Sequence, residues 1–441
     1  MYTKINYKTL FSLLGQWILW GSIIGIFIGS TTALLLETND FLGELREEKH
    51  NWLIFFLPLA GILVGYIYMK LGKVSINDTI HDSAALNNLV IDSVNGEKKM
   101  LRRTGPIVYV ATFITVLFGG STGREGAAVQ MGASVAQTVN NYFKINILDN
   151  KILLMSGISA GFGAAFGTPI TGTIFGMEMA ALGKIRFEAV VPCLVASFVG
   201  HYMTTAAWGV KHETLLIQTV PEASLLLFAK VIFVAVIFSL LTITYCQLRH
   251  GIQSLTEKLF NKNHMKRAFV GGLIIVGLTL LVGSQDYNGR GLHVLEQSFI
   301  EEVHPFAFLA KLVFTAVTLG TGFVGGEAIP LFFMGATLGN ALHTYIGLPL
   351  SFLAALGLIA AFSGGTNTPI AAFLLSMEMF NGEALQYFFI VCIVSYIFAG
   401  HHGLWPSQKI HEPKSRLYNT LSGETIENIE KKKKIKHKKG L

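Results

Sequence analysis

Long apolar stretches separated by short polar connections dominate the pattern of this chain. An apolar stretch of roughly 20 residues is long enough to cross a bilayer as a helix, and several of these are too short or too rich in glycine to be simple spans. The pattern predicts an all-α polytopic membrane protein with interrupted helices. The stretches lie at about residues 11–36, 52–69, 105–118, 149–166, 187–208, 223–247, 268–284, 305–320, 328–347 and 350–400.

The two halves of the chain contain similar segments. Residues 168–179 read TPITGTIFGMEM and residues 368–379 read TPIAAFLLSMEM, a separation of 200 residues (368 − 168). GREGAAVQMGASV at 123–135 likewise resembles GGEAIPLFFMGATL at 325–338. Such repeats in membrane proteins pack about a pseudo-two-fold axis and place the substrate site where broken helices meet. The sequence therefore predicts a duplicated membrane unit.

We expect four parts in the chain. A short cytosolic amino terminus at 1–10 precedes a first transmembrane repeat at 11–210, and a second repeat at 222–408 precedes a basic cytosolic tail at 409–441. The first apolar stretch is longer than the apolar core of a signal peptide and has no small-residue cleavage pattern before Leu34, so it predicts a retained helix.

Composition and charge agree with a membrane protein. The chain is 51% hydrophobic and 14% charged, with a mean hydropathy of +0.52, which excludes an ordinary soluble domain. The net charge of +7 matches a terminal run of seven lysines, so it does not indicate nucleic-acid binding. The lysine run predicts a cytosolic tail with little structure of its own. The basic cluster at 98–103 predicts a connection that meets the cytosol, and we expect both termini to be cytosolic. Cys193, Cys246 and Cys392 lack metal-ligand spacing and are expected in the core.

Prolines and acids mark helix ends inside the apolar stretches. Pro169, Pro330 and Pro369 each lie near the start of an apolar run, where a missing N–H costs the helix nothing. Glu178 and Glu378 would be costly against lipid, so they must face the protein interior or an aqueous vestibule. We expect both to accept hydrogen bonds from a neighbouring helix end.

The segment from Phe118 to Val135 places Arg124 and Glu125 in an apolar neighbourhood. Its glycines allow a close turn, and a helix is expected from Ala127 to Phe143. The free N–H groups of a helix start attract anions, and an acid there can occupy the anion's place or move away. Glu125 is thus either a gate or half of an Arg–Glu pair that satisfies itself in a buried turn. The polar run LNNL at 86–89 likewise has two interpretations, a loop or the wall of a cavity.

No enzyme motif occurs in the sequence. Walker A, HExxH and GxSxG patterns are missing, and His401 and His402 lack partners for a zinc site. A metal held by Glu125 and Glu327 is a further alternative, but it lacks other ligands. We therefore expect neither an enzyme nor a cofactor.

The motifs resemble those of the CLC family of chloride channels and anion/proton antiporters. GREGA at 123–127 is similar to the family's GREGP, and GFVGGEAIP at 322–330 stands where the family has GxFxP. GAAFGTPITGTIFGMEM at 163–179 and AKLVFTAVTLGTGF at 310–323 also match. The resemblance implies a homodimer with one pore per subunit, each an inverted repeat of broken transmembrane helices. It also implies that Glu125 is the external gating glutamate.

The same resemblance implies which residues surround the anion. They are Leu86, Asn87 and Asn88 in place of the central serine motif, Gly123, Arg124, Gly126 and Ala127 in the first loop, Gly326, Ala328 and Ile329 in the second loop, and Trp405 in place of the inner-gate tyrosine.

Departures from the common family pattern favour its fluoride/proton antiporter branch. The central serine is missing, Met179 stands where many transporters have an inner proton-carrying acid, and Glu327 lies beside the second loop. That branch tends to have Met at the central position and Thr at two loop positions, whereas this chain has Leu86, Ala127 and Ile329. Fluoride is therefore the favoured substrate and chloride the alternative.

The leading functional hypothesis is secondary-active exchange of a small inorganic anion for protons. A passive anion channel is the alternative, because channels of this family also lack the inner acid. Glu327 is predicted either to replace that acid or to have a structural role. If it replaces the acid, Glu327→Gln should weaken proton-coupled flux while the dimer stays folded and stable.

Overall fold

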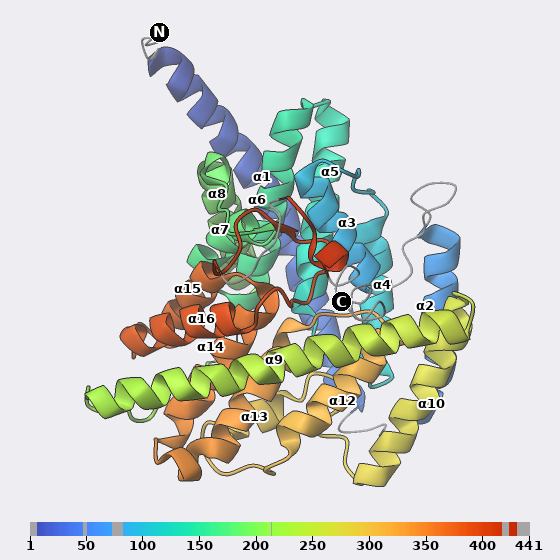
Figure 1. Ribbon diagram of the computed structural model, residues 1–441. Coiled ribbons are helices and arrows are strands. Elements are labelled where there is room, and N and C mark those ends of the chain that lie inside the picture. Colours follow the sequence, from blue (N-terminus) through green and yellow to red (C-terminus); the bar gives the residue numbers. More distant parts are fainter. Residues whose placement is uncertain (1–6, 47–50, 73–82, 213, 417–422, 430–441) are drawn as a thin grey trace.

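The structure, a computed structural model, describes residues 7–46, 51–72, 83–212, 214–416 and 423–429. Nearly all of its regular structure is helical (Figure 1). The helices of the first half are α1 (Tyr7–Glu44), α2 (Leu57–Leu71), α3 (Ser83–Asn95), α4 (Thr104–Leu117), α5 (Glu125–Phe143), α6 (Ile147–Phe166), α7 (Pro169–Glu178) and α8 (Val190–Tyr202).

The second half repeats this order. Its helices are α9 (Leu225–Leu259), α10 (His264–Val282), α11 (Leu292–Gln297), α12 (Ala307–Gly320), α13 (Ala328–Ile346), α14 (Leu350–Thr366), α15 (Pro369–Met379) and α16 (Leu385–Phe398). The apolar stretch 350–400 is thus three helices. Short elements complete the fold: η2 (Asn51–Phe56), η3 (Phe187–Ala189), η4 (Met203–Ala207), β1 (Ala181–Leu182) and β2 (Lys409–Ile410).

Helix lengths show the duplication directly. Helices α4 and α12 both have 14 residues, and α5 and α13 both have 19 residues. In each pair the starting residues are 203 positions apart (307 − 104 and 328 − 125). Corresponding helices also pack against corresponding partners: α5 contacts α6, and α13 contacts α14. The predicted internal repeat is therefore present in the fold, while the four domain boundaries stay a prediction.

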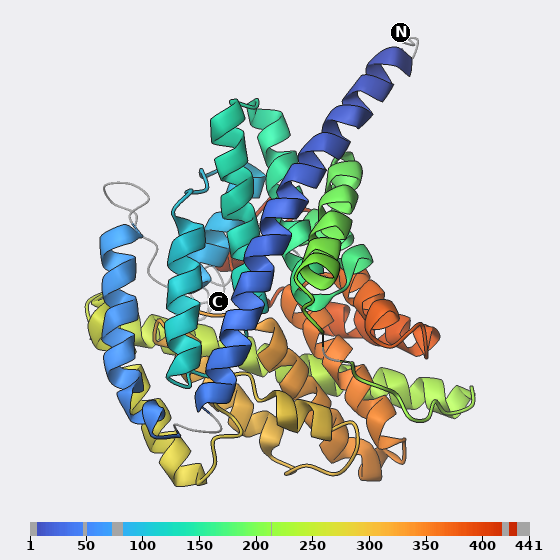
Figure 2. The ribbon, with the colours of Figure 1, turned by 180° about the vertical axis from the view of Figure 1, so that it is seen from behind.

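Five described helical segments are long and apolar enough to cross a membrane, and several shorter apolar helices accompany them. The longest, α1 and α9, run across opposite faces of the molecule (Figures 1 and 2). Figure 2 shows α1 passing between α4 and α8. Short, broken helices fill the space between these long ones, as the glycine-rich apolar pattern predicts.

The broken helices begin where proline and a left-handed residue coincide. Gly167 with φ of 73° separates α6 from α7, and Asn367 with φ of 60° separates α14 from α15. Pro169 and Pro369 are then the first helical residues, where the missing N–H is not needed. Pro330 lies in the first turn of α13. The predicted helix starts are confirmed.

Glu178 and Glu378 each cap the helix that begins in the opposite half. The carboxylate of Glu178 accepts hydrogen bonds from the backbone N–H groups of Ile370 (3.2 Å) and Ala371 (2.8 Å). The carboxylate of Glu378 accepts from those of Ile170 (2.9 Å) and Thr171 (2.7 Å). A carboxylate at a helix N-terminus satisfies unpaired donors and complements the helix dipole. The two acids therefore have the expected structural role.

The described part of the carboxyl-terminal region, before the lysine run, packs against the rest of the molecule. Strand β2 pairs in parallel with β1, and Ile410, Ile426 and Ile429 bury their side chains against Leu182. Apolar residues interspersed after Gln408 explain this packing. The lysine run from residue 431 onward lies outside the described residues. All three cysteines are buried, as expected.

Candidate functional site

The two glycine-rich loops of the repeat are bonded to each other at the centre of the molecule. Gly123 and Gly326 form an antiparallel bridge, with N···O distances of 2.8 Å and 2.6 Å. A Cβ atom added to Gly126 would lie 2.8 Å from the Cα atom of Gly326, so only glycine allows this approach. The bridge brings the N-termini of α5 and α13 together, and their dipoles favour negative charge there.

Glu125 is the first residue of α5, two residues earlier than the helix start that the sequence predicts. Its side chain is buried, and Oε2 accepts a hydrogen bond from the backbone N–H of Arg124 at 3.0 Å. Arg124 Nε lies 3.7 Å from Glu125 Oε1. The carboxylate therefore lies beside a helix start, where the helix dipole favours negative charge.

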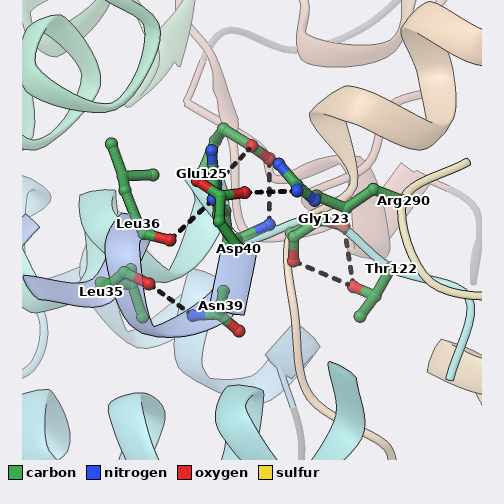
Figure 3. Close-up of polar contacts among 10 residues, drawn as sticks. Leu35, Leu36, Asn39, Asp40, Thr122, Gly123, Glu125 and Arg290 are labelled. Carbon is green, nitrogen blue, oxygen red and sulfur yellow. Dashed lines mark hydrogen bonds and ion pairs between the residues drawn. The ribbon is translucent and has the colours of Figure 1, made fainter. Parts of the chain in front are cut away.

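Arg124 also belongs to a cluster of charged side chains beside this carboxylate. Asp40, near the end of α1, places Oδ1 2.5 Å from Arg124 Nη1 and 2.5 Å from Arg290 Nη2 (Figure 3). Arg124 further donates to the carbonyl oxygen of Leu36 at 2.8 Å. Asp40 and Arg290 are separated from Glu125 along the chain, so sequence reasoning did not find them. Together these contacts direct most of the Arg124 guanidinium toward α1.

Glu327 is the residue immediately before α13, and by the 203-residue spacing of the helix starts it corresponds to Arg124 rather than to Glu125 (327 − 124). Its Oε1 atom is 3.0 Å from Arg249 Nε and accepts a hydrogen bond from the Tyr245 hydroxyl at 3.2 Å. Both partners come from α9, and all three side chains are buried. Arg249 carries no motif and lies far from Glu327 along the chain, so the sequence alone did not indicate this cation. Glu327 is therefore half of a buried ion pair.

A narrow cavity lies between the two carboxylates. Its volume is about 30 Å³, which is enough for a water molecule or a small ion. The predicted residues that line it are Asn87, Glu125, Gly126, Glu327, Ala328 and Trp405. Its remaining walls come from Val129, Phe162, Phe166, Phe175, Met179, Phe362, Thr366 and Leu404.

The LNNL segment at 86–89 is helical and contributes one residue to the cavity wall. The segment is part of α3 rather than a loop, and Asn87 lines the cavity. The Gln130 amide donates to Asn87 Oδ1 at 2.6 Å, which leaves Asn87 Nδ2 as the atom that can donate toward an anion. Asn88 instead accepts a hydrogen bond from the Ser407 backbone at 3.2 Å, and Leu86 is buried in the core.

The other predicted anion-binding residues lie around the cavity rather than on its surface. Gly123 and Gly326 form the bridge between the loops, and Arg124 faces Asp40. Ala127 and Ile329 are buried in the first turns of α5 and α13. These residues shape the backbone that faces the site.

Aromatic side chains form the part of the cavity that the sequence analysis missed. The ring centroids of Phe162 and Phe175 are 4.3 Å apart, and those of Phe175 and Trp405 are 6.0 Å apart. The recurring glycine and phenylalanine of GFGAAF at 161–166 are the sequence signal that could have indicated them. The edge of an aromatic ring carries partial positive charge, so such a wall can face an anion without a full cation.

Comparisons with known proteins agree with this arrangement. The family model described as voltage gated chloride channel matches residues 76–400. A chloride/fluoride channel protein of Pseudomonas syringae pv. tomato (strain ATCC BAA-871 / DC3000) is 38% identical over 408 residues, covering 91% of this chain and 88% of that protein.

Solved structures show the same fold. A CLC-type fluoride/proton antiporter superposes with a TM-score of 0.85 at 32% identity, covering 92% of this chain and 100% of the other. A slow cyanobacterial Cl−/H+ antiporter gives a TM-score of 0.73 at 18% identity, covering 87% and 94% of the two chains, and this supports the fold alone. The family match, the close relative and the paired loops identify the chain as a member of the voltage-gated chloride channel (CLC) family.

Proposed function

We propose that this protein is a membrane transporter that exchanges a small inorganic anion, fluoride in preference to chloride, for protons. The observation that carries the proposal is the placement of two buried carboxylates, Glu125 and Glu327, on one narrow cavity where two helix N-termini converge. The helix ends and Asn87 supply donors to an anion, and the carboxylates supply sites for a proton. No enzymatic step is part of this function.

The relatives support the choice of ion. Two similar proteins are described as a chloride/fluoride channel protein and a fluoride/proton antiporter. The small cavity favours the smaller ion, and its mostly apolar wall requires that backbone N–H groups, Asn87 and aromatic edges replace the water lost from the anion.

Glu125 is the gate in this mechanism. When it is ionised it occupies the outer anion position beside the α5 N-terminus, and when it is protonated that position becomes available to the anion. The Glu125 carboxyl group thus either carries a proton, or is ionised and bound at the N-terminus of α5. Glu327 is the second acid of the proton path, since Met179 lines the cavity where an inner acid would otherwise stand.

Replacing Glu125 by Gln tests this assignment. We expect anion flux to persist while proton movement disappears, because the amide leaves the outer position open and carries no proton. Proteoliposomes with an imposed fluoride or chloride gradient measure both ions, through an anion electrode and an internal pH dye. Glu222→Gln, the same change at an exposed loop residue, is the control and should behave as the unmodified protein.

Two outcomes would contradict the proposal. Unchanged proton coupling in Glu125→Gln would remove Glu125 from the proton path. Anion flux in the unmodified protein that never drives protons uphill would favour the second candidate, a passive anion channel, for which the apolar Met179 in the cavity is the specific observation. Comparing fluoride with chloride in the same vesicles decides the substrate.

The proposal also includes the assembly and orientation that the family resemblance implies. We propose a homodimer in the cell membrane with both termini in the cytosol. Cross-linking in native membranes tests the dimer, and labelling of single cysteines introduced near each terminus tests the orientation. Labelling of either terminus from outside intact cells would contradict it.

A further inference from the structure

Lys311, on α12, is a fully buried lysine that the mechanism above does not use. Its ammonium group donates hydrogen bonds to the carbonyl oxygen atoms of Gly289 at 2.8 Å and Tyr287 at 3.2 Å. It also lies 5.2 Å from the centre of the Phe333 ring. Burying a cation is costly unless it is well solvated by the protein, so these carbonyl groups are fixed by the need to surround it.

The segment that Lys311 binds is bonded directly to the glycine-rich loop before Glu125. The Gly289 carbonyl that accepts from Lys311 also accepts from the backbone N–H of Thr122 at 3.1 Å. The next residue, Arg290, binds Asp40, which in turn binds Arg124. Two short chains of contacts therefore run from Lys311 to the residues on either side of Gly123.

Two more side chains on the same face of α12 hold this loop. Thr315 Oγ1 lies 3.0 Å from the Ser121 hydroxyl, and Thr318 Oγ1 accepts from the Ser121 backbone N–H at 3.2 Å. Residues 311, 315 and 318 are four and three positions apart, so they share one side of the helix. Helix α12 thus presents a polar face to the loop, and Lys311 is its charged member.

We infer that Lys311 is a positioning residue for transport: it fixes segment 287–290 against the loop at 119–123 and so sets where Glu125 stands at the start of α5. This inference rests on the proposed function, in which the position of Glu125 decides whether anion and proton move together. Lys311 itself contacts neither the cavity nor the anion. It acts through the carbonyl of Gly289 and through the Arg290–Asp40–Arg124 chain.

Replacing Lys311 by Met removes the ammonium and keeps an unbranched side chain. We expect anion exchange in proteoliposomes to slow by about ten- to a hundred-fold, because small displacements of a reacting group have effects of this size. We also expect fewer protons to move per anion. Lys311→Arg, which keeps donors to the carbonyls, should recover a large part of both the rate and the ratio.

Arg267→Met is the matched control, because Arg267 is also fully buried and also donates to a backbone carbonyl, that of Gly320, at 3.2 Å. Arg267 is on α10 and bonds the last residue of α12, whereas Lys311 lies near the first turn of α12. Loss of Arg267 should lower thermal stability without changing the number of protons moved per anion. A proton-to-anion ratio that changes equally in both variants would mean that Lys311 acts only through general stability, and the inference would be wrong.

A second measurement does not depend on transport. Hydrogen exchange of the peptide that contains Thr122 should be faster in Lys311→Met than in the unmodified protein, by about ten-fold or more, while peptides of α14 stay unchanged. Unchanged exchange at Thr122 overturns the inference even if transport is altered. Faster exchange together with failure of all proton coupling in the unmodified protein would instead reject the proposed antiport and leave the role of Lys311 in the loop intact.

Discussion

At the scale of single residues, the pair formed by Glu327 and Arg249 changes what is expected of this acid. The sequence alone places Glu327 in an apolar loop, where replacement by Gln should leave the protein stable. The 3.0 Å contact with Arg249, itself 1% exposed, makes Glu327 a counter-charge as well. A structural role and a transport role are therefore combined in one side chain, and a single substitution cannot separate them.

The substitution Glu327→Gln should destabilise the protein by about 3–5 kcal/mol, because it leaves the Arg249 charge buried without its counter-charge. The double variant Glu327→Gln with Arg249→Met should recover most of that stability. Thermal unfolding in detergent measures the stability of both variants. Proton-coupled flux in proteoliposomes measures whether Glu327 takes part in transport. If the stable double variant still moves protons with the anion at the normal ratio, Glu327 has only a structural role.

At the scale of helices, close packing at glycine is repeated in the two halves. A Cβ atom added to Gly132 on α5 would lie 2.2 Å from the carbonyl oxygen of Gly157 on α6. A Cβ atom added to Gly335 on α13 would lie 2.1 Å from the carbonyl oxygen of Gly357 on α14. Small residues let membrane helices approach closely, so these contacts fix the directions of α5 and α13 toward the cavity.

Alanine at Gly132 should therefore destabilise the protein by about 1–3 kcal/mol, since the added methyl group meets a backbone carbonyl that cannot move aside. Gly277→Ala, in the middle of α10, is the control because nothing lies within 4 Å of the added Cβ atom. That change should be neutral or stabilise by up to about 1 kcal/mol through the better helix propensity of alanine. Equal melting temperatures for the two variants would show that the α5–α6 contact is looser than described.

At the scale of the whole molecule, the carboxyl-terminal segment closes onto the transmembrane part. Gln408 donates to the carbonyl oxygens of Met179 and Thr366, both at 2.8 Å, and β2 pairs with β1. Trp405, just before this segment, lines the cavity. The described part of the tail therefore covers Leu182 and adjoins residues that line the cavity.

Truncation after Gln408 should lower the unfolding free energy by about 2 kcal/mol, the cost of exposing the Leu182 side chain, and more if Trp405 becomes mobile. Truncation after Ile429, which removes only the lysine run and its neighbours, should leave stability and exchange rate unchanged. Melting temperature and proteoliposome flux of the two truncated proteins test this. A stable, fully active protein ending at Gln408 would contradict the structural role of the segment.

The sequence by itself determined the fold class and the duplication, and it placed Glu125 close to a helix start. Each depends on local signals: apolar length, proline at helix starts, glycine in the loops, and motifs repeated about 200 residues apart. Helix starts and the cost of an acid inside an apolar stretch depend on only a few neighbouring residues. Glu125, Glu178 and Glu378 could therefore be assigned to helix ends before their partners were known.

Only the tertiary structure decided which side chains surround those helix ends. Arg249 and Glu327 are 78 positions apart (327 − 249), and Asp40 and Arg124 are 84 apart (124 − 40), so no periodicity joins them. The aromatic walls are only weakly indicated in advance: GFGAAF at 161–166 contains Phe162, but Phe362 looks like an ordinary core residue until α6 and α14 bring the two rings together. Contacts between glycines distant in sequence set the directions of the helices, and those directions determine which side chains line the cavity.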